Sequence, residues 1–278
     1  MSSIQSSTSS KRTASSFIAL DGRVSVITGG SRGIGAAAGL ELAKAGSSIA
    51  LIDIDEGSAS RTAGEIAKQT GVTARAYAAS VTDRATVTST LARIAQEFGG
   101  IDHLVNNAGI QFVNPLDTFP DDKWDLVRSI DLDGVFNMTK AVWPHLVARG
   151  RGRIVNLASV QGIIATEYKI AYVASKHGVI GITQATALEG APLGITANAV
   201  CPGAVLTDLV KNQAPELARS YGGITEEEAL ERAFLVNMPT KRFIMPDEIG
   251  QLITYLCTDA AKSITGAAIA IDGGWTAH

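Results

Sequence analysis

A regular alternation of short apolar segments with longer amphipathic segments constrains the fold of this chain more than any other feature. Strand-length runs rich in β-branched residues occur at 24–28, 48–53, 73–79, 101–107, 153–159, 195–200 and 267–272. Helix-length segments lie between them, at 33–45, 56–69, 83–98, 122–149, 171–191 and 246–257. Apolar strands that alternate with helices are typical of a parallel sheet covered on both faces. The sequence therefore predicts a doubly wound, Rossmann-type α/β domain.

The first 19 residues differ in composition from the rest. They are rich in serine, lack acidic residues and include only Lys11 and Arg12 as charged residues. So little apolar surface cannot order a chain, and we expect a disordered tail over 1–19 and a single domain over 20–278. A transit peptide is the alternative, which a single arginine supports only weakly. Within the domain, the polar helical segment 204–244 is expected to form a lid.

Charge and cysteine content exclude several classes of protein. The net charge is −3, and the lysines and arginines are dispersed, so no basic surface for nucleic acid is expected. No apolar run reaches the ~20 residues of a membrane span. Cys201 and Cys257 lie in apolar segments and indicate buried thiols of a reducing, cytoplasmic compartment. The four histidines are far apart in the sequence, so no metal site is predicted.

The segment TGGSRGIG, residues 28–35, joins the first predicted strand to the first helix. Gly29, Gly33 and Gly35 permit a tight turn, close approach of a pyrophosphate and close packing of the helix on the strand. Asp53 ends the second strand about 20 residues later, where an acid accepts hydrogen bonds from the adenosine ribose. This combination predicts a dinucleotide site.

Two residues disagree about which dinucleotide binds. The Asp53 carboxylate would repel a 2′-phosphate and favours NAD, whereas Arg32 in the glycine turn would attract one. We give Asp53 more weight, because it would face the ribose while Arg32 can turn into solvent. The alternative for Asp53 is a carboxylate that only caps the next helix.

A phenol and an ammonium share one helix face near the middle of the chain. Tyr172 and Lys176 are four residues apart, so their side chains point into the same space. A nearby ammonium favours the phenolate, which is the property that a general acid/base needs. Ser159 directly follows a predicted strand and could hydrogen-bond a substrate oxygen at the carboxyl edge of the sheet.

The order and spacing of these motifs resemble the short-chain dehydrogenase/reductase family over residues 20–275. The matching motifs are TGGSRGIG at 28–35, NNAG at 106–109, the serine of NLASVQG at 156–162, Tyr-x-x-x-Lys at 172–176, PG at 202–203 and IDGG at 271–274. The resemblance implies an oxidoreductase that uses NAD and usually forms a homotetramer. Besides the residues named above, it implies cofactor contacts from Ser31, Ile34, Asn107, Ala108, Gly109, Pro202, Gly203, Val205 and Thr207.

The resemblance also assigns catalytic roles. Tyr172 exchanges the alcohol proton, Lys176 also binds the nicotinamide ribose, and Ser159 orients the substrate oxygen. Asp131 departs from the pattern, because the family usually has an asparagine there that helps to hold a water behind the lysine. If the backbone carbonyl holds the water, Asp131 serves equally; if the side-chain amide is required, the proton relay is altered.

Within the family the chain is most similar to 3-hydroxybutyrate dehydrogenases. The resemblance implies that Gln111, Lys169 and Gln213 bind a substrate carboxylate, which needs a cation and amide donors once it leaves water. Gln161 stands where a histidine is usual and can still donate a hydrogen bond. Ala204 stands where a tryptophan is usual, so the pocket is expected to accept a longer or branched 3-hydroxy acid.

Three alternatives remain open at this point. The substrate could be a neutral ketone or a sugar, with the carboxylate ligands incidental. It could be a 3-oxoacyl group on a carrier protein, although the 204–244 segment has no net positive charge to receive an acidic carrier. A non-catalytic dinucleotide-binding protein is the third alternative, and the presence of Ser159, Tyr172 and Lys176 argues against it.

Overall fold

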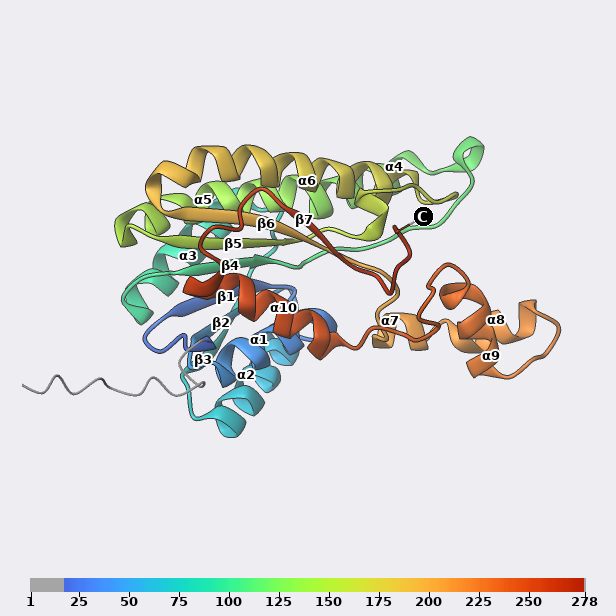
Figure 1. The fold of residues 1–278 in the computed structure, drawn as a ribbon, viewed down its shortest axis with the longest axis horizontal. Helices are drawn as coiled ribbons and strands as arrows, with labels where there is room; N and C mark the ends of the chain where they lie inside the picture. The colour runs from blue at the N-terminus through green and yellow to red at the C-terminus, as the bar shows by residue number, and fades with distance from the viewer. Residues whose placement is uncertain (1–17, 278) are drawn as a thin grey trace, which may run out of the picture.

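The computed structural model describes residues 18–277, which form a seven-stranded parallel sheet with helices on both faces (Figure 1). The strand order is β3-β2-β1-β4-β5-β6-β7. The strands are β1 (Val24–Thr28), β2 (Ser48–Asp53), β3 (Ala74–Ala78), β4 (His103–Asn106), β5 (Gly152–Leu157), β6 (Ile195–Pro202) and β7 (Ala268–Ile271). The predicted doubly wound α/β fold is confirmed. Residues 1–17 of the tail predicted over 1–19 lie outside the described residues.

Two layers of helices cover the sheet. On one face lie α1 (Gly33–Lys44), α2 (Glu56–Thr70) and α10 (Pro246–Cys257); on the other lie α3 (Arg84–Phe98), α5 (Gly134–Arg149) and α6 (Ile170–Gly190). Short 3-10 turns occur at Leu116–Thr118, Val160–Gly162, Ala191–Leu193 and Asp259–Ala261. No helix within residues 18–277 is long and apolar enough to cross a membrane.

Local sequence explains where several helices begin and end. The carboxylate of Asp55 accepts the backbone N–H of Ser58 at the start of α2, and Asp83 caps α3 in the same way. Gly71 and Gly99 follow these helices with φ of 78°, a conformation that glycine adopts without strain. These caps fix the ends of α2 and α3, and the buried apolar side chains of both helices face the sheet.

The helical region predicted over 122–149 is confirmed, but it is not one regular α-helix. The chain instead forms α4 (Asp121–Arg128), a π turn at Ser129–Asp133, and then α5. A π turn holds one more residue than an α turn, so it rotates the following side chains relative to the helix before it. Here it places Asp131 fully inside the protein, whereas Asp133 stays nearer the surface and pairs with Arg128 at 2.7 Å.

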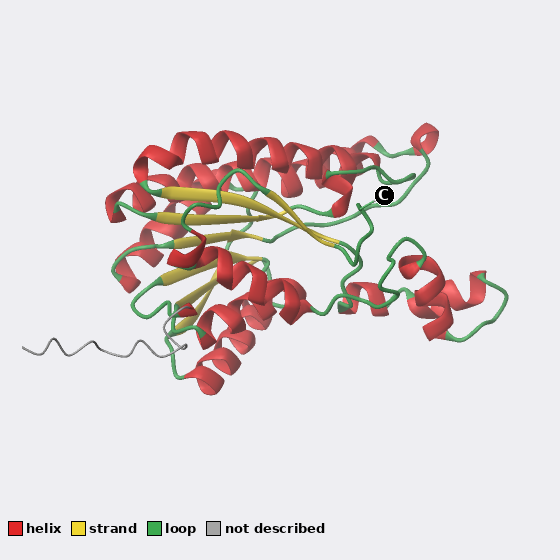
Figure 2. Cartoon of the chain, viewed as in Figure 1, coloured by secondary structure: helices red, strands yellow, loops and turns green. Residues whose placement is uncertain are grey.

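The segment predicted as a lid is helical and stands apart from the sheet. It contains α7 (Asp208–Lys211), α8 (Ala214–Ser220), α9 (Glu226–Leu230) and a π turn at Glu231–Leu235. Figure 2 shows these helices beyond the ends of the strands, joined to the rest of the domain by two connections. Buried Leu235 and Met238 fix the returning connection to the core. That this segment closes over a substrate stays a prediction.

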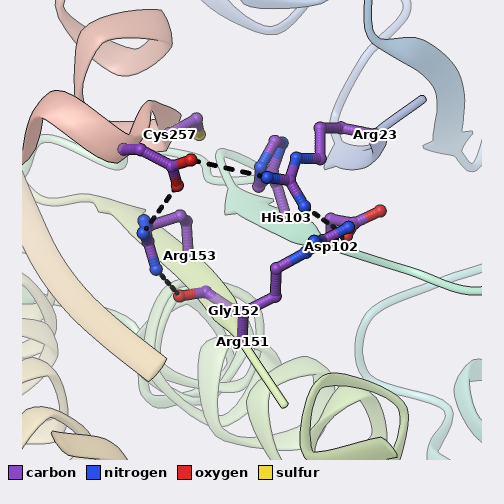
Figure 3. A pocket seen from close by; sticks show the side chains of 8 residues that line it. Arg23, Asp102, His103, Arg151, Gly152, Arg153 and Cys257 are labelled. Atoms are coloured by element: carbon purple, nitrogen blue, oxygen red, sulfur yellow. Dashed lines mark hydrogen bonds and ion pairs between the residues drawn. The ribbon is translucent and has the colours of Figure 1, made fainter. Parts of the chain in front are cut away.

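An ion-pair cluster joins the amino ends of β1, β4 and β5 (Figure 3). Asp102 is 1% exposed and accepts hydrogen bonds from Arg149 Nη2 at 2.9 Å and Arg151 Nε at 3.0 Å. Arg153 lies beside them and pairs with Asp259 at 3.3 Å. Each buried charge therefore has a partner of opposite sign, as burial requires. The predicted site residues lie at the other edge of the sheet.

Candidate active site

The predicted site residues follow the carboxyl ends of β1, β4, β5 and β6. In the sheet, β1 lies between β2 and β4, so the chain reverses its direction of progress across the sheet after β3. At such a switch point the loops after the two adjacent strands diverge and leave a crevice that binds ligands. The glycine turn after β1 and the NNAG segment after β4 both border this point.

The glycine turn has the backbone that a pyrophosphate requires. Gly29 and Gly33 adopt φ of 62° and 57°, and a Cβ on Gly35 would overlap the carbonyl oxygen of Gly29. Arg32 precedes α1 without a side-chain cap, and the first turn of α1 has no acidic residue. The backbone N–H groups and the positive end of the helix dipole therefore remain available to an anion. These residues fit a dinucleotide.

The side chain of Asn107, the residue that follows β4, holds the glycine turn in place. Asn107 Nδ2 donates to the carbonyl oxygens of Thr28 at 2.9 Å and Gly29 at 3.0 Å. In return, Thr28 Oγ1 accepts the backbone N–H groups of Asn107 at 3.0 Å and Ala108 at 3.1 Å. The structure thus brings Asn107 and Ala108 against the turn. Sequence reasoning missed Thr28, although a hydroxyl residue that ends a buried strand is a usable signal.

Asp53 ends β2 beside the glycine turn. Its Oδ2 accepts the backbone N–H of Ser31 at 3.0 Å, and its Oδ1 accepts that of Asp55 at 3.1 Å. Since Asp55 caps α2, the alternative in which Asp53 is the cap of that helix is wrong. Arg32 is exposed, whereas Ile34 packs partly buried against the core.

The start of the lid lies against the glycine turn. Gly203 follows β6 and donates its N–H to the Ile271 carbonyl at 3.0 Å. Val205 forms a bridge with Ile244, where the lid returns to the domain. Thr207 then begins α7, and its Cγ2 would lie 3.6 Å from a Cβ added to Gly33. The structure therefore places the predicted cofactor contacts at 202–207 next to those at 29–35.

Ser159, Tyr172 and Lys176 converge at the carboxyl end of β5. Ser159 is 8% exposed and its Oγ accepts the backbone N–H of Gln161 at 3.2 Å. Tyr172 and Lys176 lie in the first turns of α6, with Lys176 Nζ 5.3 Å from the centre of the tyrosine ring. The same Nζ donates to the Leu157 carbonyl at 2.9 Å. Sequence reasoning missed that contact, since a backbone acceptor leaves no sequence signal.

Asp131 forms an ion pair with Lys176. Its Oδ2 lies 3.2 Å from Lys176 Nζ, and its Oδ1 accepts the Ile110 N–H at 2.8 Å. Burial raises the pKa of Asp131, and the ammonium opposes part of that rise. Burial is the largest single influence on Lys176 and would lower its pKa, but Asp131, Tyr172 and Cys201 together make the net direction upward. Lys176 is therefore held as an ammonium.

Beneath the site, a chain of buried amides and hydroxyls connects four elements. Asn106 Nδ2 donates to Asn156 Oδ1 at 2.8 Å and to Thr139 Oγ1 at 3.2 Å. Asn156 Nδ2 donates to Thr183 Oγ1 at 2.8 Å. These bonds fix β4 and β5 to α5 and α6, so the catalytic helix is held in register with the sheet. Asparagines inside apolar strands were the signal that sequence reasoning did not use.

Lys169 precedes α6 and is half-buried. None of the side chains that the structure describes pairs with its ammonium, and burial alone lowers its pKa. Gln161 is 6% exposed, and its Oε1 has no described hydrogen-bond partner. The Tyr168 carbonyl accepts the Asn114 N–H at 2.8 Å, which joins the loop of Lys169 to the loop that follows β4.

The other two predicted carboxylate ligands are less enclosed. Gln111 is exposed on the loop after β4, and Gln213 is exposed at the start of α8 in the lid. Ala204 is 7% exposed and packs in the core with Met238. No group of three or more histidine, cysteine, aspartate or glutamate side chains in the described part of the chain could hold a metal ion.

Comparison with known proteins adds an independent observation. The family profile described as enoyl-(acyl carrier protein) reductase matches residues 29–276. The chain belongs to the short-chain dehydrogenase/reductase family. It is 42% identical to D-beta-hydroxybutyrate dehydrogenase of Rhizobium meliloti (92% of this chain, 99% of the relative). It is 39% identical to the enzyme of the same name from Cupriavidus necator (93% and 100%).

A solved structure of the family supports the same assignment. The structure of L-sorbose reductase from Gluconobacter frateurii, complexed with NADPH and L-sorbose, superposes with a TM-score of 0.89. It is 29% identical and covers 93% of this chain and 98% of the reductase. Membership of this family makes the chain an oxidoreductase of the nicotinamide-dinucleotide class. The resemblance to short-chain dehydrogenases/reductases that the sequence motifs indicated is therefore confirmed.

Proposed function

We propose that this protein is an NAD-dependent dehydrogenase that interconverts 3-hydroxybutyrate, or a related 3-hydroxy acid, and the corresponding 3-oxo acid. The observation that carries the proposal is the half-buried side chain of Lys169, which lies three residues before Tyr172 and whose ammonium has no partner among the described side chains. An anionic ligand would stabilise a partly desolvated cation of this kind. Two relatives named D-beta-hydroxybutyrate dehydrogenase support the same substrate.

The proposed mechanism assigns a proton step to this chain. When bound, the nicotinamide dinucleotide supplies the hydride acceptor. The Tyr172 oxygen takes the alcohol proton, and the Lys176 ammonium, 5.3 Å from the ring centre, stabilises the phenolate that accepts it. Ser159 donates a hydrogen bond to the substrate oxygen and holds it toward Tyr172. The Leu157 carbonyl and Asp131 hold Lys176 in place.

NAD rather than NADP is proposed because Asp53 lies at the end of β2, bonded to Ser31 in the glycine turn. A 2′-phosphate brought to this carboxylate would meet like charge. The exposed Arg32 is the observation that favours NADP, because its guanidinium would attract a 2′-phosphate. The first assay follows NADH formation with D-3-hydroxybutyrate, beside NADP, the L-enantiomer, longer 3-hydroxy acids and a neutral secondary alcohol. Activity on the neutral alcohol alone would retain the family chemistry and exclude the proposed substrate.

The carboxylate clamp is tested by Lys169→Met, which keeps the length and apolar contacts of the side chain and removes its charge. A hydrogen bond to a charged group contributes roughly 1.5–3 kcal/mol, so kcat/KM for 3-hydroxybutyrate should fall about 10- to 100-fold. The rate with butan-2-ol, which has no carboxylate, should not fall. Lys140→Met, on the exposed side of α5, is the matched control. Equal losses on both substrates would exclude the clamp.

We also propose a cytoplasmic homotetramer. Support comes from two free, buried cysteines and from apolar side chains exposed on two long helices. Phe136 and Val147 on α5 are 46% and 41% exposed, and Leu188 on α6 is 79% exposed. Such surfaces mark sites of association. Light scattering during size-exclusion chromatography measures the mass, and a monomer at micromolar concentration would contradict the proposal.

A further inference from the structure

The ion pair between Asp131 and Lys176 places a negative charge behind the ammonium on which Tyr172 depends. Asp131 is fully buried, and Lys176 is 4% exposed. Their charged atoms are 3.2 Å apart, which is direct contact distance for an ion pair. The π turn at Ser129–Asp133 turns Asp131 toward the interior, so the backbone fixes the position of its carboxylate.

We infer that Asp131 is a positioning residue that displaces the pH range of the reaction to higher pH, because its carboxylate cancels much of the field that the Lys176 ammonium exerts on Tyr172. The inference rests on the proposed chemistry of Tyr172 and Lys176. It does not depend on which alcohol is oxidised.

Few titratable groups face Lys176, so a change in the pH profile can be assigned to Asp131. Three titratable groups face Lys176: Asp131 from the π turn, Tyr172 from the same helix and Cys201 from β6. Burial raises the pKa of Cys201 to about 11, so this thiol is neutral at the working pH. Asp131 is then the only carboxylate facing the ammonium among the described residues; burial raises its pKa, and the Lys176 ammonium opposes that rise and favours the ionised form. The Ile110 N–H, at 2.8 Å from Oδ1, further stabilises its ionised form.

The distances set the size of the effect. The carboxylate is 3.2 Å from Lys176 Nζ, which is itself 5.3 Å from the centre of the Tyr172 ring. Two unit charges about 8 Å apart in a medium of effective dielectric about 20 interact strongly enough to move a titration midpoint by about one unit or slightly more. Without the carboxylate, the forming Tyr172 phenolate still favours the charged form of Lys176, and the Leu157 carbonyl still accepts from its Nζ. Removing the carboxylate then strengthens the net positive field at the phenol, so the phenolate forms at lower pH.

The test compares Asp131→Asn, which is isosteric and neutral, with the wild type. We expect the acid limb of kcat/KM for alcohol oxidation to move to lower pH by about one unit. Asp131→Ser is the second variant, since it also removes the charge and keeps a polar atom on the side chain. Asp133→Asn is the matched control, because it removes a carboxylate from the same turn that pairs with Arg128 instead.

A structural role for Asp131 would lower kcat at every pH and leave the midpoint unchanged, and that result would overturn the inference. So would a shift of the same size in Asp133→Asn, or a shift to higher pH. The profile is measured on whichever secondary alcohol the wild type oxidises. Failure of the proposed substrate therefore shows as absent activity on 3-hydroxybutyrate, and failure of this inference shows as an unmoved midpoint.

Discussion

His103 is a histidine inside an apolar strand, and its burial should make the stability of the domain depend on pH. The side chain is 3% exposed, and its Nδ1 lies 2.8 Å from Ser25 Oγ. Burial is the largest cause that lowers its pKa from 6.5 to about 3; Asp102 opposes the change, while Arg153 and Arg23 add to it. His103 is therefore neutral in the folded protein at any pH at which the enzyme is handled.

The sign and size follow from linkage. Between pH 6.5 and about 3 the unfolded chain binds a proton at this position and the folded chain does not, so stability falls as pH falls. Each pH unit within that window contributes about 1.4 kcal/mol. Between pH 7.5 and 4.5 the contribution of His103 to the free energy of unfolding should therefore decrease by about 2.5 kcal/mol.

His103→Asn removes the titration and keeps a polar atom near the position of Nδ1 for Ser25. The free energy of unfolding is measured by urea titration at fixed protein concentration from pH 4.5 to 7.5. The variant should be less stable than the wild type at pH 7.5, and the difference should shrink or reverse at pH 4.5. His145→Asn, on α5, is the control for a histidine replacement. Parallel stability curves for wild type and His103→Asn would refute the reasoning.

Two glycine substitutions test two different properties, the affinity for NAD and the stability of the domain. Gly35→Ala brings a Cβ against the Gly29 carbonyl and within 2.6 Å of Asn107 Nδ2, so the dissociation constant for NAD, measured by fluorescence titration, should rise at least about tenfold. Unchanged NAD affinity would contradict the role of this turn. Gly64→Ala, on the exposed side of α2 with open space around it, should stabilise the protein by about 0.5–1 kcal/mol in the same urea titration. A loss of stability there would show that the site is not open.

The periodicity of the sequence predicted the seven strands to within two residues at each end. The five strands between β3 and β7 are almost fully buried and largely apolar, which makes them easy to recognise. The glycine turn and the Tyr172–Lys176 pair were equally accessible, since both depend on local spacing. The π turn was not. Nothing in residues 122–149 marks it, and it is stabilised by partners of Asp131 that lie elsewhere, the Ile110 N–H and Lys176.

The predicted carboxylate ligands show the same limit. Lys169 can be placed before α6 from sequence, but the partial burial of its side chain depends on how the loops after β4 and β5 meet. Gln213 depends on the lid, whose short helices follow no long periodic pattern. Side chains whose role depends on contacts between distant segments therefore stay predictions until the contacts are measured.

The hydrogen bonds from Asn107 to the carbonyls of Thr28 and Gly29 join residues 79 and 78 positions apart. The first strand, turn and helix thus hold the sequence fingerprint of a dinucleotide site without the contact that sets its shape. During synthesis a finished site can exist only after β4 has entered the sheet beside β1. A dinucleotide that binds the finished turn stabilises a long-range contact, so its binding energy is linked to the unfolding of the whole domain rather than of its first unit.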